Sequence, residues 1–205
     1  MTVLHLGDDE NRFSPEWLQR VHSTLDEVDD VLVTTGGGKF YSNGLDLEWL
    51  MANGDKAAEY VADVQELFAR VLTLPVPTVA AVNGHAFGAG AMLAMAHDFR
   101  VMRGDRGYFC FPEADINIPF TPGMAALIQG KLTPASAIAS MTTGRRFGGA
   151  DALSFGLVDE IAAEDEVVKV ASERVRALAG KDRGTLGAIK ATMFAPAVTA
   201  LRTPA

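Results

Sequence analysis

The apolar residues of this chain follow two different patterns. In "VLVTT" (31–35) and "TVAAV" (78–82), apolar and β-branched residues stand at consecutive positions, which is typical of strands buried on both faces. Between residues 56 and 72, apolar residues recur at helical spacing until the prolines of "PVPTV" end the run. We therefore predict two buried strands with a long amphipathic helix between them.

Shorter signals place further elements around these three. Ser14 followed by Pro15 and Glu16 is a helix N-cap signature, and it predicts a helix that runs to about Asp26. The segment "AMLAMAHDF" has the composition of a helix buried nearly all round, and "VLHL", "RVMRG" and "GYFCF" are expected to be short strands. Strands that alternate with helices predict an α/β fold with a parallel sheet.

The last third of the chain has a different character. From about Thr133, the segments "TPASAIASMTTG", "GGADALSFG" and "EDEVVKVASERVRALAG" are successive helix candidates separated by glycines. We therefore expect an α/β core over residues 1–135 and a mostly helical region over residues 136–205.

Composition and charge narrow the function classes. The chain has 205 residues, 48% of them hydrophobic and 21% charged, which suits one well-packed domain. Its net charge of -8 argues against a general nucleic-acid or anionic-membrane surface. Cys110 is the one cysteine, so an internal disulfide and a multi-cysteine metal site are excluded. Because no stretch reaches membrane-spanning length and no targeting signal is seen, we expect a cytoplasmic protein.

Two glycine-containing loops follow the buried strands, namely "GGGKFYSNGLDL" and "NGHAFGAGAML". Neither is a phosphate loop, because the Walker lysine with serine or threonine is missing and the spacing does not fit G-x-G-x-x-G. A glycine turn that opens into a helix leaves free N–H groups at the positive end of the helix dipole, where an oxyanion can be held. Tight packing of a strand against a helix would explain such a loop equally well.

One acid stands in unusual surroundings. Glu113, in "FPEADINIP" (111–119), follows a run of aromatic residues, and burial there would penalise its charged form. Together with the two glycine loops, this carboxyl group would make a minimal proton-transfer site, in which backbone donors stabilise an enolate and a base moves the proton. The alternative is a structural acid that caps a local turn or pairs with an arginine such as Arg145 or Arg146.

The other polar candidates are expected to be structural. Asp46 and Asp115 would bind backbone N–H groups and fix their loops, as aspartate commonly does. His85 and His97 have no G-x-S-x-G serine to serve and no metal-ligand spacing, so we predict neither a catalytic triad nor a metal site.

Four blocks of sequence resemble a known family. They are "KFYSNGLDL" (39–47), "PTVAAVNGHAFGAGAMLAMAHDFRVM" (77–102), "FPEADINIP" (111–119) and "TTGRRFGGADALSFGLVDEI" (142–161). In order and approximate spacing they resemble the crotonase, or enoyl-CoA hydratase/isomerase, superfamily. The resemblance implies a crotonase-like spiral of ββα units with a helical C-terminal region. It also implies that this chain begins at the second strand of the family.

The resemblance also implies roles for particular residues. In this family two backbone N–H groups hold the thioester oxygen, and these fall on Leu45 and Ala89. Hydratases carry two glutamates, and the corresponding positions here are Met92 and Glu113. Methionine can neither activate water nor give a proton, so the chain most resembles the plant-type Δ3,Δ2-enoyl-CoA isomerases, with Glu113 as the sole acid and base. The residues expected around the substrate are Phe40, Ser42, Asn43, Gly44, Asp46, Gly88, Met92 and Phe120.

The ligand and the assembly follow from the same resemblance. The substrate would be an acyl-CoA thioester, with coenzyme A as part of the substrate and no separate cofactor. Lys39, Arg145 and Lys190 are candidates to meet its phosphates, and Asn117 stands where many relatives have a glycine with positive φ. The helical region would build a homotrimer or a dimer of trimers. Hydration or hydrolysis of a CoA thioester, and a catalytically silent acyl-CoA-binding protein, stay open as alternatives.

Overall fold

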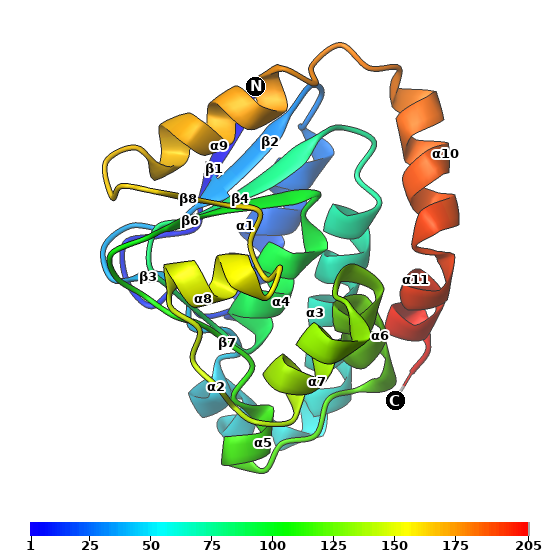
Figure 1. Ribbon diagram of the computed structural model, residues 1–205. Coiled ribbons are helices and arrows are strands. Elements are labelled where there is room, and N and C mark those ends of the chain that lie inside the picture. The colour runs from blue at the N-terminus through cyan, green and yellow to red at the C-terminus, as the bar shows by residue number, and fades with distance from the viewer. Residues whose placement is uncertain (205) are drawn as a thin grey trace.

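The two buried runs form the centre of a five-stranded parallel sheet. In the computed structural model, which describes residues 1–204, every residue of both runs that lies in a strand is buried. All four strand pairings are parallel, as predicted (Figure 1). The spatial order is β1-β2-β4-β6-β8, with β1 (Thr2–His5), β2 (Leu32–Thr35), β4 (Thr78–Val82), β6 (Phe99–Arg103) and β8 (Glu160–Ala162).

Both faces of this sheet are covered, which explains the unbroken apolar runs. On one face, α9 (Val167–Arg176) packs against β2, β4 and β6, where it buries Val33, Val79 and Val101. The alternate residues of the same strands face the main core, which includes Leu32. A strand with two buried faces needs apolar residues at every position, so consecutive rather than alternating hydrophobicity is the correct signal.

A smaller parallel sheet lies next to the first. Its strands are β3 (Phe40–Ser42), β5 (His85–Phe87) and β7 (Phe109–Cys110), in the order β3-β5-β7. The residue pattern predicts loops for β3 and β5, because each strand is only three residues long and lies in a glycine-rich segment. Three times along the chain, a strand of the large sheet is followed by a strand of the small sheet and then by a helix. These successions are β2–β3–α2, β4–β5–α4 and β6–β7–α5. These are the ββα units that the family resemblance implies.

Three helices of the core, α1, α3 and α4, lie where the sequence predicts them, and the others were not predicted. The helix α1 (Pro15–Asp26) begins as expected, with the Ser14 hydroxyl accepting a hydrogen bond from Trp17 N at 3.2 Å. The helix α4 (Ala89–Ala96) is buried at every position. The other core helices are α2 (Leu47–Ala52), the 3-10 helix η1 (Gly54–Lys56), α3 (Ala57–Leu72), α5 (Glu113–Ile116) and α6 (Pro122–Lys131).

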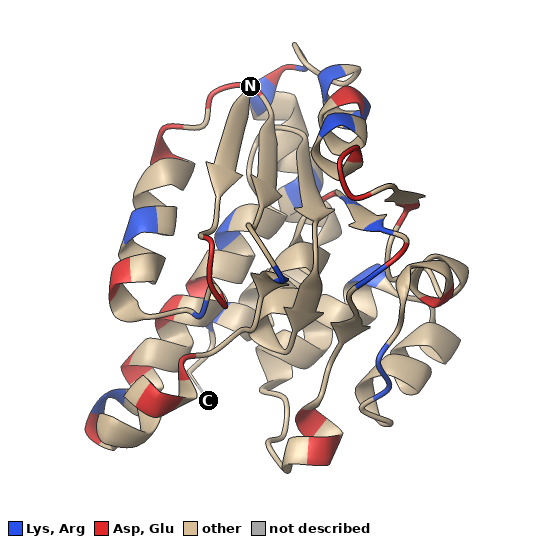
Figure 2. Cartoon of the chain, turned by 90° about the vertical axis from the view of Figure 1, so that its left-hand side faces the viewer, with Lys and Arg blue, Asp and Glu red and all other residues tan. Residues whose placement is uncertain are grey.

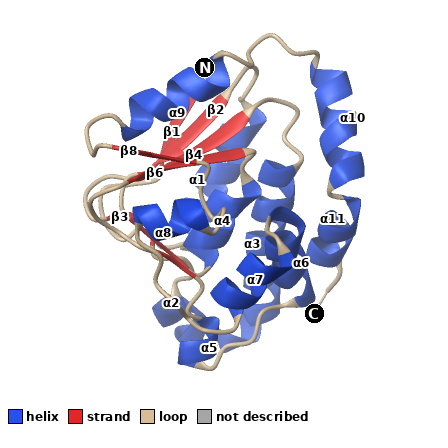
Figure 3. Cartoon of the chain, in the orientation of Figure 1, coloured by secondary structure: helices blue, strands red, loops and turns tan. Residues whose placement is uncertain are grey.

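The C-terminal region is helical except for β8, a three-residue strand that the sequence pattern does not predict. The last helix packs against α3 and α6, so this region folds back on the core (Figures 1 and 3). In residues 1–204 no single helix is both long and apolar enough to cross a membrane; α10 and α11, bent by 75°, pass that test only as a pair. The helices after α6 are α7 (Pro134–Met141), α8 (Gly149–Ser154), α9, α10 (Arg183–Met193) and α11 (Ala195–Arg202).

Charged residues lie mostly on the helices and loops and leave the centre of the large sheet apolar (Figure 2). Acidic residues outnumber basic ones by 26 to 18. The sign of the net charge therefore comes from the surface, and the core depends on apolar packing and on a few hydrogen-bonded polar groups.

One such polar group is the fully buried His97, which links β2 to α4. Its Nε2 lies 3.0 Å from the Thr34 hydroxyl, and that hydroxyl lies 2.8 Å from the Tyr41 hydroxyl. Its Nδ1 lies 2.8 Å from the Leu93 carbonyl, so both ring nitrogens have partners. Burial lowers the pKa of His97 to about 3, which keeps the ring neutral. The prediction that His97 is structural is confirmed.

Candidate active site

Glu113 is the first residue of the short helix α5, and its side chain is almost entirely buried. Its Oε2 atom has no hydrogen-bond partner among the described residues. Burial raises the pKa of Glu113 from its ordinary value of 4.5 to about 7, and a hydrogen bond from its own backbone amide opposes that rise only in part. This carboxyl group is therefore poised between its neutral and charged forms near neutral pH.

The structural alternative for Glu113 needs an arginine partner. Arg145 instead pairs with Asp151 at 2.7 Å and lies over the ring of Phe147. Arg146 lies near the site, over the ring of Phe87, but in residues 1–204 no ion pair joins it to Glu113. The buried carboxyl group is thus neither paired nor used as a helix cap.

Glu113 faces a cavity of about 210 Å³. The lining comes from five separate stretches of the chain, which the fold brings together near the ends of β3, β5 and β7. Among the described lining residues Glu113 is the only acid. The lining consists of Arg12, Asn43, Leu45, Leu47, Phe87, Gly88, Ala89, Cys110, Pro112, Glu113, Ile116, Ile118 and Arg146.

The first free amide in this cavity belongs to Ala89, at the start of α4. Gly88 precedes it with φ +51° and donates its own N–H to the Cys110 carbonyl at 3.0 Å. The Ala89 N–H donates to no described residue, as expected at the first position of a helix. A Cβ atom on Gly88 would lie 3.5 Å from Glu113 Oε1, so glycine leaves the space between amide and carboxyl group open.

The second free amide belongs to Leu45, in the loop after β3. Gly44 has φ +81°, and its N–H donates to the Ser42 hydroxyl at 3.1 Å. The next amide, that of Leu45, donates to no residue between 1 and 204. A Cβ atom on Gly44 would lie only 2.9 Å from Ala89 N, so this loop packs directly on the start of α4. Both amides and Glu113 therefore belong to one cavity.

Of the eight residues expected around the substrate, Asn43 and Gly88 line the cavity and six do not. Ser42 is fully buried, and with Gly44 it shapes the loop that carries Leu45. Met92 is buried in the core and does not line the Glu113 cavity. The remaining three are Phe40, which lies beside His85; Asp46, which caps α2; and Phe120, which lies against Phe111.

The three basic residues expected at the CoA phosphates lie in different surroundings. The prediction for Lys190 is wrong, because this residue is buried and its Nζ donates to Asp98 at 2.6 Å and to the Val76 carbonyl. Arg145 is held by Asp151, and Lys39 lies over the ring of Phe40. Lys39 and Arg145 do not line the Glu113 cavity either.

The expectations for the loop residues have mixed outcomes. Asp46 caps α2 through Trp49 N at 3.0 Å, as predicted for an aspartate that fixes its loop. Asp115 is exposed beside Gly144, and among the described residues none donates a hydrogen bond to its carboxylate, so the same prediction is wrong there. Asn117 has φ +58°, and the predicted left-handed conformation is confirmed.

Several cavity residues were missed from the sequence. Arg12 pairs with Glu10 at 2.6 Å, and Glu10 also accepts a hydrogen bond from Asn43, so this cluster supports the loop of the second amide. Ile116 and Ile118 line the cavity although each is more than 40% exposed. No local sequence pattern marks these two isoleucines as part of an apolar wall.

Cys110 also lines the cavity, where its thiol donates to the Gly144 carbonyl at 3.3 Å. Burial raises the pKa of Cys110 to about 11, so the group is an unreactive thiol at neutral pH. Cys110 is thus a buried free thiol.

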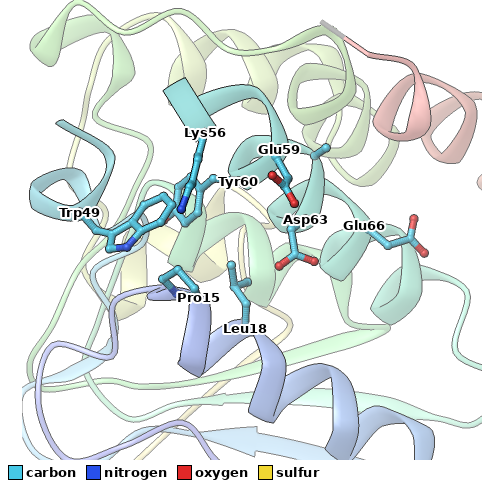
Figure 4. Close-up of a pocket in the computed structure, with 9 residues that line it drawn as sticks. Pro15, Leu18, Trp49, Lys56, Glu59, Tyr60, Asp63 and Glu66 are labelled. Carbon is cyan, nitrogen blue, oxygen red and sulfur yellow. The ribbon is translucent and has the colours of Figure 1, made fainter. Parts of the chain in front are cut away.

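A larger cavity of about 690 Å³ lies between α1, α2 and α3 (Figure 4). Its wall carries Glu59, Asp63 and Glu66, and Trp49 and Tyr60 lie side by side at one end. It shares no lining residue with the Glu113 cavity. None of these carboxylates is buried, whereas Glu113 in the smaller cavity is.

Fold and site together define a class: an α/β enzyme-like scaffold of ββα units in which one buried carboxyl group faces two free backbone amides. The family model described as enoyl-CoA hydratase/isomerase matches residues 5–204. The chain therefore belongs to the enoyl-CoA hydratase/isomerase family, and the predicted crotonase membership is confirmed.

Three relatives illustrate the similarity. Enoyl-CoA delta isomerase 2, peroxisomal, from Arabidopsis thaliana is 37% identical over 183 residues, which cover 82% of this chain and 76% of the relative. Enoyl-CoA delta isomerase 3 of the same plant is 38% identical over 169 residues, covering 76% and 70%. The crystal structure of a probable enoyl-CoA hydratase from Mycobacterium tuberculosis has 30% identity and a TM-score of 0.90, over 98% of this chain and 88% of that one. The predicted crotonase-like fold is confirmed, and a crotonase-type reaction on a CoA thioester is the activity these names support.

Proposed function

We propose that this protein is a Δ3,Δ2-enoyl-CoA isomerase, which converts a 3-enoyl-CoA into the trans-2-enoyl-CoA. One observation supports this most directly: among the described lining residues Glu113 has the single carboxyl group, its Oε2 is buried without a partner, and it shares the cavity with two free amides. The plant relatives named enoyl-CoA delta isomerases support the same choice.

The proposed reaction needs only groups that line the cavity. The Glu113 carboxylate takes a proton from C2 of the 3-enoyl thioester, and the electrons move into a dienolate whose oxygen accepts hydrogen bonds from the Leu45 and Ala89 amides. The protonated Glu113 then returns the proton at C4, the double bond comes to lie between C2 and C3, and the carboxylate is regenerated. No atom is gained or lost, so coenzyme A is part of the substrate and no separate cofactor is required.

The raised pKa of Glu113 suits both halves of this reaction. A carboxyl group with a pKa of about 7 is ionised in a large part of the molecules at neutral pH, yet it is a stronger base than an ordinary glutamate. Hydration would need a second group to deliver water, and the position of the second glutamate of hydratases is Met92, which is buried in the core.

Assembly and location complete the proposal. We propose a homotrimer or a dimer of trimers, built through the helical region after residue 135, and light scattering of the purified protein would measure its mass. We also propose the cytoplasm as its location, on the basis of the single reduced cysteine. Some plant relatives are named peroxisomal, and imaging of the tagged protein would distinguish the two compartments.

The experiment that tests the function is product analysis with a 3-enoyl-CoA. The purified protein is incubated with the substrate, and 2-enoyl-CoA, 3-hydroxyacyl-CoA and free acid are separated by chromatography. Accumulation of 2-enoyl-CoA alone supports the isomerase. A 3-hydroxy product would indicate a hydratase, a free acid would indicate a thioesterase, and tight binding without turnover would indicate a silent acyl-CoA-binding protein.

A further inference from the structure

Ser42 is the last residue of β3, and its hydroxyl is fully occupied inside the protein. It accepts a hydrogen bond from Gly44 N at 3.1 Å and donates one to the Asn11 carbonyl at 2.7 Å. The side chain has no exposed surface and does not line the Glu113 cavity. A substrate therefore does not reach this hydroxyl, although Ser42 is expected from the sequence to contact the substrate.

The two bonds of Ser42 fix the direction of the loop that follows. Because the Gly44 N–H turns inward to Ser42, the next N–H, that of Leu45, is left free on the cavity side. The loop is held at other points as well: Gly44 O accepts from Phe13 N at 2.9 Å, and Asn43 N donates to the Glu10 carbonyl at 2.8 Å. The Phe13 bond holds the peptide group that contains the Leu45 N–H, and the Ser42 bond holds the peptide group directly before it.

Ser42 also packs against the helix that carries the second free amide, that of Ala89. A Cβ atom on Gly90, in the first turn of α4, would lie 2.4 Å from Ser42 O and 2.8 Å from Ser42 Cβ. The helix that carries the Ala89 amide is thus seated on the backbone and side chain of Ser42, with no space for even one methyl group. One residue contacts both elements that supply a free amide.

We infer that Ser42 is a positioning residue of the oxyanion site, which together with the Phe13–Gly44 bond sets the direction of the Leu45 N–H and its separation from the Ala89 N–H. Ser42 acts by holding the backbone in place and does not contact the substrate. This inference rests on the proposed function, because it assigns Ser42 to the stabilisation of the dienolate.

The test compares Ser42→Ala with Ser140→Ala. Ser140 is a matched control, because it is equally buried and its hydroxyl donates to the Ser136 carbonyl within α7, away from the cavity. Donors that are slightly misaligned lose transition-state stabilisation more than ground-state binding, so Ser42→Ala should lower kcat about tenfold and change KM less than twofold. Ser140→Ala should change neither, and Ser42→Cys, which keeps a weaker hydrogen-bonding group, should recover part of kcat.

A second readout does not depend on turnover. The backbone ¹H–¹⁵N resonances of Leu45 and Ala89 should both move in Ser42→Ala and stay in place in Ser140→Ala. If the wild type does not isomerise 3-enoyl-CoA, the proposed function fails while the resonances still report the positioning role. Unmoved resonances, an unchanged kcat, or a raised KM at constant kcat would each overturn the inference, the last by giving Ser42 a direct contact with the substrate.

Discussion

Glu113 and His97 are both buried ionisable side chains, yet their surroundings differ in every respect that matters for chemistry. Both nitrogens of His97 have partners at 2.8 and 3.0 Å, and burial lowers its pKa to about 3. Glu113 has an oxygen without a partner, faces a cavity, and has its pKa raised to about 7. A buried group that is fully hydrogen-bonded contributes to stability, whereas one that is left incomplete beside a cavity is available for a reaction.

The largest expected effect separates the two residues by activity. Glu113→Gln removes the base but keeps the size of the side chain, so kcat for isomerisation should fall by about 10²–10⁴-fold. His97→Leu, measured in the same assay, should retain kcat per folded molecule to within about twofold. Equal losses in the two variants would remove the distinction between them.

The same glutamine variant should make the protein more stable above neutral pH. The folded-state pKa of Glu113 lies above the ordinary 4.5, so the folded protein binds a proton more tightly than the unfolded chain does. The cost of holding the charged carboxylate is therefore absent below about pH 4.5 and grows as the pH rises to about 7, where it reaches roughly 3 kcal/mol. Urea unfolding should show a stability gain for Glu113→Gln at pH 8 and little gain at pH 4.5.

The variant His97→Leu should, in contrast, be less stable than the wild-type protein. His97→Leu leaves the Thr34 hydroxyl with only Tyr41 as a partner, and it should lower the free energy of unfolding by about 1–3 kcal/mol. The folded-state pKa of His97 lies below the ordinary 6.5, so the unfolded chain binds the proton more tightly, and the loss should be constant above about pH 7.5 and shrink as the pH falls below 6.5. A loss in urea titrations that does not shrink between about pH 7.5 and pH 5 would show that the folded ring also takes up a proton.

The smallest effect concerns the pH dependence of the reaction. The carboxylate form of Glu113 is the base, so kcat/KM should rise with pH through about 7 and fall about tenfold per pH unit below it. Rate measurements from pH 5 to pH 9 would check this limb. A limb near pH 4.5 would mean that the carboxyl group is solvated in the working enzyme.

Much of the fold could be predicted because each strong local signal agreed with its tertiary role. Ser14 and Pro15 predicted the start of α1, and the consecutive apolar runs predicted the central strands because both faces of the large sheet are covered. The strands β3, β5 and β8 could not be predicted in this way, because three residues show no periodicity. Their identity depends on pairing with distant segments.

The residues of the candidate site likewise fall into those that could be predicted from the sequence and those that could not. Glu113, Leu45 and Ala89 could be assigned because a family resemblance carried them, and their shared cavity agrees with that assignment. Lys190 could not be placed from sequence, because its buried pairing with Asp98 joins segments 92 residues apart. The cavity wall of Ile116 and Ile118 depends on where α5 is seated, which no local pattern reveals.

The most direct test of the single-base mechanism follows the proton itself. A 3-enoyl-CoA with deuterium at both C2 positions is converted by the wild-type protein in ordinary water, and the 2-enoyl-CoA product is examined by mass spectrometry and NMR. Because Glu113 would carry the deuteron across a cavity whose lining offers no second acid, the product should hold deuterium at C4. A product with no deuterium at C4, or a 3-hydroxyacyl-CoA, would contradict Glu113 as the one group that both removes and returns the proton.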